Sequence, residues 1–310
     1  MESYEVVIVG GGAAGLSAGL VLARARRTVA VIDGGQPRNG PAARMQGFLS
    51  RDGLPPGELL ELGWREVSGY GGDRIDGVVT SVRATGTAGF GVELDGRVVN
   101  ARRVLLTTGL RDALPDIPGV ADRWGRDVLH CPYCHGYEVR DQRLAVLGGT
   151  PDAVDHAQLV RQWSADVVYF PHTDTLTADQ REQLVARAIG VVDGDVARLL
   201  VDGDRLQAVE LVDGRTVARD AVFVRPLLVP NHQLLVGLGC AVSDSGWVTS
   251  DSTGRTTVPG VWVAGNAGDP RAQVITAAGQ GSAAAIAINA DLVEEDVRIA
   301  VRSFRLGLPA

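Results

Sequence analysis

The chain begins with the stretch Tyr4-Glu5-Val6-Val7-Ile8-Val9-Gly10-Gly11-Gly12-Ala13-Ala14-Gly15. The apolar run predicts a buried parallel strand, and the alanine- and leucine-rich sequence that continues to about Arg26 predicts a helix. Between them lies G-x-G-x-x-G, whose glycines permit a tight turn and a close approach of the backbone to a pyrophosphate. A second predicted strand, Thr28–Ile32, ends at Asp33, a carboxylate placed to bind a ribose hydroxyl. Together these features predict a dinucleotide site.

A second stretch carries candidate chemistry and reads Leu129-His130-Cys131-Pro132-Tyr133-Cys134-His135-Gly136-Tyr137-Glu138. Two cysteines at this spacing can reach disulfide distance within one helical turn. In a chain without secretory signals, C-x-x-C indicates a redox pair, and a position near a helix N-terminus would lower the pKa of Cys134. Half of a zinc site is the alternative, but zinc needs four ligands, and the remaining cysteine, Cys240, stands alone in the sequence.

A further strand, turn, helix and strand follow the cysteines. Strand 143–147 leads into Gly148-Gly149-Thr150-Pro151-Asp152-Ala153, and strand 166–170 follows the helix. The pattern resembles a repeat of the first nucleotide-binding unit, but Thr150 replaces the glycine that would face a pyrophosphate. At Pro171-His172-Thr173-Asp174 we expect neither an acid for a ribose nor an arginine pair for a 2′-phosphate. This unit is therefore expected to keep the fold and to have lost its dinucleotide.

Composition limits the class of protein. The chain has 310 residues, 45% of them hydrophobic, which is enough for two domains with their own cores. All 30 basic residues are arginine, which excludes Schiff-base chemistry at a lysine and a Walker lysine. The arginines are dispersed, so we expect no nucleic-acid partner, and no apolar run reaches the roughly 18 residues of a membrane span. A strand begins too early for a signal peptide, so we expect a cytoplasmic protein with a cycling disulfide.

The other patterns complete the expected organisation. They predict a helix over 58–70, strands over 75–83, 90–94, 98–99 and 103–107, a proline-rich linker over 115–119, and a final strand and helix over 258–263 and 276–289. The N-terminus of that last helix is a ready anion site. Cys240 is expected in the core, and His156 and His172 are expected at the surface. His232 is expected to be a solvated loop residue, with a substrate-facing role as the alternative.

These residues resemble the low-molecular-weight thioredoxin reductase family over nearly the whole chain. The shared elements are the first glycine motif with its acid, Thr107-Thr108-Gly109, the proline-rich linker, the C-x-x-C, and the final strand, glycine and helix with Gln273. The resemblance implies an α/β fold of two Rossmann-like nucleotide-binding domains, the second inserted in the first. It implies a homodimer, a discontinuous FAD domain over 1–116 and 246–310, and an inserted domain over 117–245. The residues that it assigns to FAD are Gly10, Gly12, Ala13, Ala14, Gly15, Asp33, Gly34, Gln36, Arg38, Asn39, Gly47, Val79, Thr108, Gly109, Gly265, Asn266, Gln273 and Val274.

The sequence departs from those reductases at four places. His135 follows the second cysteine where they usually carry an acid, Thr150 breaks the second glycine motif, and the His-Arg-Arg type of clamp for a 2′-phosphate is missing. The fourth departure is Asn266, which stands where an aspartate is usual. The first three departures, with His130 and His135 beside the cysteines, resemble the flavin-dependent dithiol oxidases. Those enzymes close disulfides in small natural products such as gliotoxin and holomycin, and they use FAD and oxygen without NADPH.

The resemblance to the oxidases implies a small dithiol substrate and oxygen as partners, with hydrogen peroxide as a product. Cys131 would exchange with the substrate and Cys134 would face the flavin, with His130 or His135 as the base. The alternatives are an NADPH-dependent reductase for thioredoxin or a similar protein, a reductase fed by ferredoxin, and a non-catalytic flavoprotein that senses redox state. No metal is expected.

Overall fold

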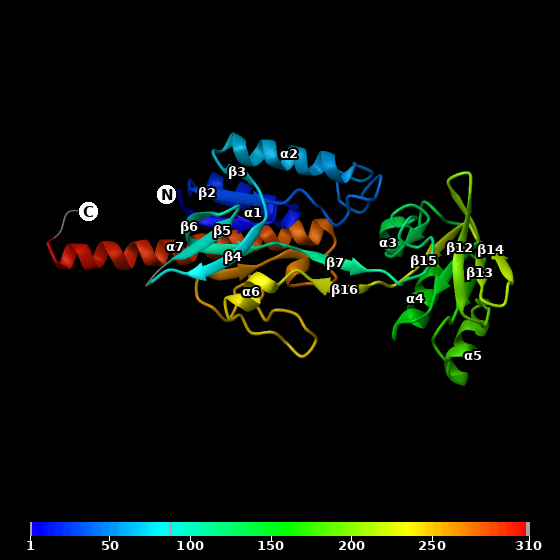
Figure 1. The fold of residues 1–310 in the computed structure, drawn as a ribbon. Coiled ribbons are helices and arrows are strands. Elements are labelled where there is room, and N and C mark those ends of the chain that lie inside the picture. Colours follow the sequence, from blue (N-terminus) through cyan, green and yellow to red (C-terminus); the bar gives the residue numbers. More distant parts are fainter. Residues whose placement is uncertain (1, 87–88, 308–310) are drawn as a thin grey trace. The chain divides into compact units, whose positions relative to one another are not determined.

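The computed structural model describes residues 2–86 and 89–307 and divides the chain into two compact units (Figure 1). Unit 1 comprises Met1–Arg38, Gly57–Arg111 and Val229–Ala310, and unit 2 comprises Asn39–Pro56 and Asp112–Leu228. A parallel sheet with helices lies at the centre of each unit. The predicted α/β fold of two Rossmann-like domains, one inserted in the other, is therefore confirmed.

The sheet of unit 1 has the strand order β3-β2-β1-β6-β5-β4, and β17 also pairs with β6. Strands β1, β2, β3, β6 and β17 run parallel, whereas β4 and β5 form an antiparallel hairpin at one side. The bounds of these strands are β1 Ser3–Val9, β2 Val29–Asp33, β3 Asp73–Asp76, β4 Val79–Ala84, β5 Phe90–Leu94, β6 Arg97–Leu106 and β17 Val261–Val263.

Both faces of the unit 1 sheet are buried, as expected for a parallel sheet. Val6 and Ile8 point into one apolar cluster, with α1 (Ala13–Arg24), α2 (Pro56–Gly69) and α7 (Val274–Arg305). Val7 and Val9 point into a second cluster on the other face, with the β4–β5 hairpin and the short helix α6 (Gln233–Gly237). This two-sided burial is why the strand reads as a continuous apolar run.

Unit 2 repeats this arrangement on a smaller scale. Its parallel sheet has the order β11-β10-β9-β15-β8, and a separate antiparallel sheet has the order β12-β13-β14. One face of the parallel sheet packs on α4 and α5, and the other face packs on β12 and β13. The elements are β8 Val128–Leu129, α3 Pro132–His135, β9 Leu144–Leu147, α4 Ala153–Val160, β10 Val167–Phe170, α5 Ala178–Ala186, β11 Gly190–Val191, β12 Val196–Asp202, β13 Arg205–Leu211, β14 Thr216–Ala218 and β15 Ala221–Phe223.

Two paired strands carry the chain across the unit boundary. β7 (Leu110–Ala113) leaves unit 1, and β16 (Leu227–Pro230) returns to it. The divisions at 111/112 and 228/229 differ from the expected 116/117 and 245/246. The chain returns earlier because α6 buries Leu235 in the unit 1 core, next to the buried Cys240. The expected core position of Cys240 is confirmed.

Four predicted elements were wrong in extent. The expected strand over 75–83 is two strands, β3 and β4, because Gly77 between them takes a positive φ of 153°. The expected separate strands over 98–99 and 103–107 are one strand, β6. The final helix, α7, begins at Val274 and runs to Arg305, well beyond the expected 289. Across the part of the chain that the structure describes, no helix combines the length and apolar character that a membrane span requires.

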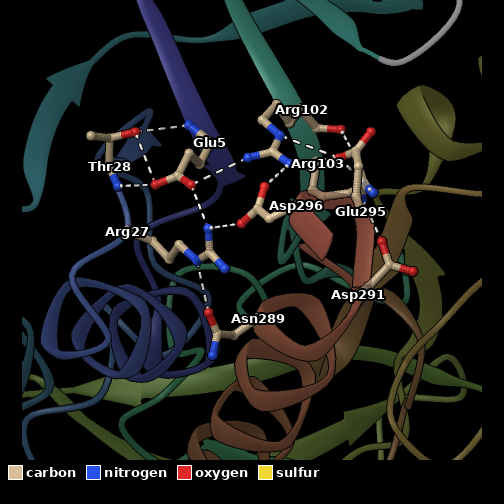
Figure 2. A network of polar contacts seen from close by, with 9 residues as sticks. All are labelled: Glu5, Arg27, Thr28, Arg102, Arg103, Asn289, Asp291, Glu295 and Asp296. Carbon is tan, nitrogen blue, oxygen red and sulfur yellow. Dashed lines mark hydrogen bonds and ion pairs between the residues drawn. The ribbon is translucent and has the colours of Figure 1, made fainter. Parts of the chain in front are cut away.

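An ionic network fastens α7 to the strands of unit 1 (Figure 2). Arg103 on β6 is buried, and its guanidinium contacts Asp291 at 2.6 Å and Glu295 at 3.1 Å. Arg102 reaches Glu295 and Asp296, and Arg27 joins Glu5 to Asp296. Among the described residues, each carboxylate that contacts Arg103 has one other cation, Arg255 for Asp291 and Arg102 for Glu295. Removing the buried Arg103 therefore takes one of two counter-charges from each of these poorly solvated carboxylates.

We predict that Arg103→Leu lowers the free energy of unfolding by about 2 kcal/mol, because Asp291 and Glu295 each lose one of two counter-charges and keep the other, from Arg255 and Arg102. Urea unfolding followed by tryptophan fluorescence measures the change. The matched control is Arg298→Leu, which breaks an exposed pair with Glu294 at 3.9 Å and is expected to cost less than about 1 kcal/mol. Equal losses in the two variants would contradict the assignment of the network as a structural fastening.

Candidate active site

The first glycine turn joins β1 to α1 and is packed tightly on one side. A Cβ at Gly10 would lie 2.5 Å from the carbonyl oxygen of Thr107, and Gly10 has a φ of 111°. A Cβ at Gly15 would overlap the carbonyl of Gly10, so helix and turn can approach only through glycine. In contrast, a Cβ at Gly12 would meet nothing within 4 Å. The turn is therefore closed toward the protein and open at Gly12.

Helix α1 begins at this open position. Gly12 is its N-cap and provides no side-chain hydrogen bond, so the first backbone N–H groups are left for a ligand. Asp33 at the end of β2 accepts a hydrogen bond from the backbone N–H of Gly11 at 2.9 Å. The carboxylate thus lies beside the glycine turn, where it can also bind a ribose hydroxyl. These features fit the pyrophosphate and ribose of the expected FAD.

The last segment of the chain contributes to the same end of unit 1. A Cβ at Gly265 would lie 3.1 Å from the side chain of Ala14, which places the turn after β17 against α1. Asn266 accepts a hydrogen bond from Arg38 at 3.2 Å, and its amide group donates to the carbonyls of Asp269 and Ala272. Asn266, which stands where an aspartate is usual, thus still has a polar side chain that is hydrogen-bonded to the backbone of the same loop.

Helix α7 opens with a second set of unpaired N–H groups. Gln273 is its N-cap and makes no side-chain capping bond, and Val274 is its first residue. The N-terminus of a helix this long carries a positive dipole end that suits the electron-rich edge of a reduced flavin.

The predicted cofactor residues are divided between the two units. Sixteen of them belong to unit 1, including Gly34, Gln36, Val79, Thr108 and Gly109. Asn39 and Gly47 belong to the segment Asn39–Pro56, which is grouped with unit 2 because Pro41 packs against Gly125. These two residues therefore lie in unit 2 and not in the expected FAD domain, and a cofactor role for them stays a prediction.

Three residues that hold the turns of unit 1 in place are not among the predicted site residues. The Thr107 hydroxyl donates to the carbonyls of Val9 and Gly10. Asn231 donates to the carbonyl of Thr108 at 2.9 Å. Gln280 accepts from the Gly265 N–H at 2.9 Å. The place of Thr107 directly after a strand was the available signal, whereas nothing local in the sequence identifies Asn231 or Gln280.

The redox motif of unit 2 is a closed disulfide. Cys131 and Cys134 are bonded, with their Cα atoms 5.2 Å apart, and both are partly exposed. Cys131 is the N-cap of α3 and Cys134 is the third residue of that helix, whose single turn gives only a small dipole. Gly136 has no room for a side chain, because a Cβ would lie 2.8 Å from the ring of Trp163. The geometry supports a redox pair over the zinc alternative, since a disulfide offers no thiolate ligand.

The histidines near the motif have different environments. His135 is partly buried, and its pKa is lowered because burial disfavours the charged ring, although the nearby Glu138 opposes this effect. His130 is also partly buried. His135 is thus neutral at pH 7 and able to accept a proton.

Two predictions of surface histidines were wrong. His156 is only 3% exposed, because it lies on the buried face of α4. His172 is partly buried, and its Nδ1 accepts a hydrogen bond from the N–H of Val196 at 3.0 Å. His232 is the N-cap of α6 and is partly buried, so it is less exposed than a solvated loop residue.

The second glycine turn lies between β9 and α4. Thr150 stands at the altered position, and its hydroxyl is buried without a hydrogen-bond partner among the described residues. The expectation that this end of β10 provides no acid was wrong, because Asp174 accepts from the Gly149 N–H at 2.6 Å. This contact repeats the one between Gly11 and Asp33 in unit 1. Asp152, the N-cap of α4, adds another carboxylate and is paired with Arg225.

Within residues 2–86 and 89–307, no three side chains of the ligating types come together in a way that could hold a metal ion.

Comparison with known proteins places this chain among disulfide oxidoreductases. The family model described as pyridine nucleotide-disulphide oxidoreductase matches residues 4–281. The thioredoxin reductase sirT of Leptosphaeria maculans is 28% identical over 317 residues, covering 95% of this chain and 96% of its own. The crystal structure of HlmI superposes with a TM-score of 0.95 at 56% identity, covering 98% of this chain and 97% of that one. An oxidoreductase from Agrobacterium tumefaciens has a TM-score of 0.88 at 34% identity, with 94% and 99% covered.

The open position of Gly12 gives a test of the cofactor site. We predict that Gly12→Ala weakens FAD binding by at least about tenfold, because a methyl group would occupy the approach of the pyrophosphate. Unfolding of the apoprotein should be unchanged, since a Cβ there meets no protein atom. Fluorescence titration of apoprotein with FAD measures the affinity. Gly237→Ala, also in open space in unit 1, is the control. Wild-type affinity in Gly12→Ala would place the pyrophosphate elsewhere.

The environment of His135 gives a pH prediction. If His135 takes the thiol proton, the rate of dithiol exchange falls as pH drops through the pKa of His135, because the protonated ring cannot accept. Burial lowers this pKa, so the fall in exchange rate on the acid side of the pH–rate profile (the acid limb) should lie below about pH 6.5, the usual pKa of histidine. Glu138→Gln removes the charge that raises the pKa and should move the limb further down. A limb that moves up, or one that persists unchanged in His135→Gln, would assign the base to another group.

Proposed function

Because this chain belongs to the pyridine nucleotide-disulphide oxidoreductase family, we propose that it is an FAD-dependent dithiol oxidase that forms an intramolecular disulfide in a small dithiol natural product. The chain is a flavin-dependent enzyme that acts on thiols and disulfides, and its cofactor is FAD. We further propose that electrons flow from the dithiol through the cysteine pair and FAD to oxygen.

The closed, partly exposed Cys131–Cys134 disulfide is the observation that carries the proposal. A substrate thiolate attacks Cys131, which forms a mixed disulfide and releases the Cys134 thiolate. The second substrate thiol then attacks the substrate sulfur of that mixed disulfide and releases Cys131. The substrate has lost two electrons and two protons and gained an S–S bond, while the enzyme pair has become two thiols. The roles of the two cysteines rest on the resemblance to dithiol oxidases.

Proton transfer is assigned to the histidines beside the cysteines. His135 follows Cys134 directly and is held neutral by burial, which suits a base for a substrate thiol. His130 is the second candidate, because it adjoins Cys131. The chemistry supplied by bound FAD is the transfer of two electrons from the cysteine pair to oxygen, which is reduced to hydrogen peroxide.

The second glycine turn supports electron flow from a dithiol to FAD over reduction of the enzyme by NADPH. Thr150 stands where a pyrophosphate requires glycine, and Asp174 places a carboxylate beside that turn. A carboxylate repels the 2′-phosphate that distinguishes NADPH, and a pair of arginines for that phosphate is missing from 171–174. An NADPH-dependent disulfide reductase is the second candidate, favoured by the retained parallel pairing of β9 with β10 and by relatives named thioredoxin reductase.

We also propose a cytoplasmic homodimer. The expectation of a dimer rests on the family resemblance. The end of α7 exposes apolar side chains that a second copy of the chain could cover, among them Val297, Val301 and Phe304.

Oxygen uptake separates the two candidate functions. The holoenzyme mixed with dithiothreitol in air, without NADPH, is predicted to consume oxygen and produce hydrogen peroxide. Under anaerobic conditions, NADPH is predicted to leave the flavin oxidised over the same time. Rapid bleaching of the flavin by NADPH, with no oxygen uptake on dithiol, would support the reductase instead.

The exchange scheme predicts that Cys134→Ser abolishes turnover of dithiothreitol while FAD stays bound. The serine cannot form the disulfide that receives the substrate electrons. Oxygen consumption and flavin absorbance measure the two properties. Cys240→Ala is the control, because Cys240 is 5% exposed in the unit 1 core, and it should turn over normally. Full activity in Cys134→Ser would refute the scheme.

A further inference from the structure

A buried histidine lies behind the redox motif. His156 is on the inner face of α4, where its neighbours Ala153, Ala157 and Val160 belong to the apolar cluster between helix and sheet. Its pKa falls to about 3, first because burial disfavours the charged ring and then because His130 and Arg225 repel its charge. His156 is therefore neutral at pH 7. A neutral ring carries one N–H donor and one acceptor nitrogen.

One contact fixes which nitrogen of His156 carries the proton. Nε2 lies 2.9 Å from the backbone carbonyl oxygen of His130. A carbonyl oxygen only accepts, so Nε2 must donate and Nδ1 must be unprotonated. Nδ1 is buried and has no hydrogen-bond partner among the described residues. Burying an imidazole with one unsatisfied nitrogen costs stability, which a plain apolar residue at this position would avoid.

The bond reaches the residue that adjoins the exchanging sulfur. The carbonyl of His130 and the N–H of Cys131 belong to one peptide group, so holding the carbonyl fixes the peptide that leads into Cys131. The ring of His156 also packs edge-on against the ring of His130, with centroids 6.2 Å apart. On another side it packs edge-on against Phe223 of β15, at 6.0 Å. His156 thus links the core of unit 2 to the start of the motif.

We propose that His156 is a positioning residue for disulfide exchange, which holds the His130–Cys131 peptide through its Nε2–H and so sets the direction of the Cys131 sulfur. This inference rests on the exchange role proposed for Cys131. Thiol–disulfide exchange requires the attacking and leaving sulfurs to lie nearly in line with the central one, so the orientation of Cys131 affects the rate. His156 touches neither the substrate nor the reacting sulfurs in this account.

The test uses the full-length holoenzyme with Cys134→Ser, so that Cys131 is the only thiol of the motif. The probe is 2-hydroxyethyl disulfide, and the rate of its exchange with Cys131 is measured against pH, with peptide mass mapping to separate Cys131 from Cys240. His156→Met keeps the volume and lacks the donor, whereas His156→Gln keeps an N–H of similar reach. His172→Met is the matched control, because His172 bonds to Val196 and not to the motif.

We expect His156→Met to slow exchange by about tenfold with unchanged FAD content. His156→Gln is expected to exchange within about twofold of the rate of the Cys134→Ser parent. The control His172→Met is expected to exchange at the same rate as that parent. If His156→Met exchanges at the rate of the Cys134→Ser parent, the proposal is overturned. Equal slowing in His156→Met and His156→Gln would also overturn it, because the packing of the aromatic ring would then matter and not its N–H. The probe reaction needs neither oxygen nor a dithiol substrate, so failure of the oxidase proposal would appear in the oxygen assay alone.

Discussion

The bond between Cys131 and Cys134 is the interaction on which the account depends. It joins two residues of one short helical turn, and its environment is built from more distant parts of unit 2. The ring of Trp163 lies against Gly136 and leaves no space for a side chain there. His156 holds the peptide on the other side of the motif. The motif is thus contacted on both sides by residues of unit 2.

The two units contain similar glycine turns, but the space around the turn differs between them. In unit 1 the turn is closed against Thr107 but open at Gly12, and the N-terminus of α1 is uncapped. In unit 2 Thr150 occupies the position that should be open, and carboxylates lie at the turn and at the start of the helix. The fold is thus retained in both units, and each turn keeps an acid, Asp33 or Asp174, whereas the open glycine position is retained in unit 1. This contrast supports our proposal that external thiols, and not NADPH, supply the electrons.

Local sequence predicted much of the fold and of the cofactor turn, because these features depend on residues close together in the chain. The strand before Gly10, the glycine spacing and the acid at Asp33 required no knowledge of distant contacts. The motif at Cys131 and Cys134 was recognised in the same way, and the structure closes it as a disulfide.

Features that depend on long-range packing could not be predicted. The burial of His156 depends on β15 and on the motif, which are distant from α4 in sequence. Asp174 lies four residues beyond β10, and only the path of the loop brings it to Gly149. The return of the chain to unit 1 was placed too late because the burial of Leu235 in short α6 gives no periodic signal.

Single-turnover mixing without oxygen tests the central claim most directly. Oxidised holoenzyme is combined with a limiting amount of a small dithiol, and the flavin spectrum and the cyclic disulfide product are followed together. The account predicts that flavin reduction accompanies formation of an equal amount of cyclic disulfide, with no pyridine nucleotide present, and that admitting oxygen restores the oxidised spectrum. A flavin that stays oxidised while the dithiol remains unchanged would contradict it.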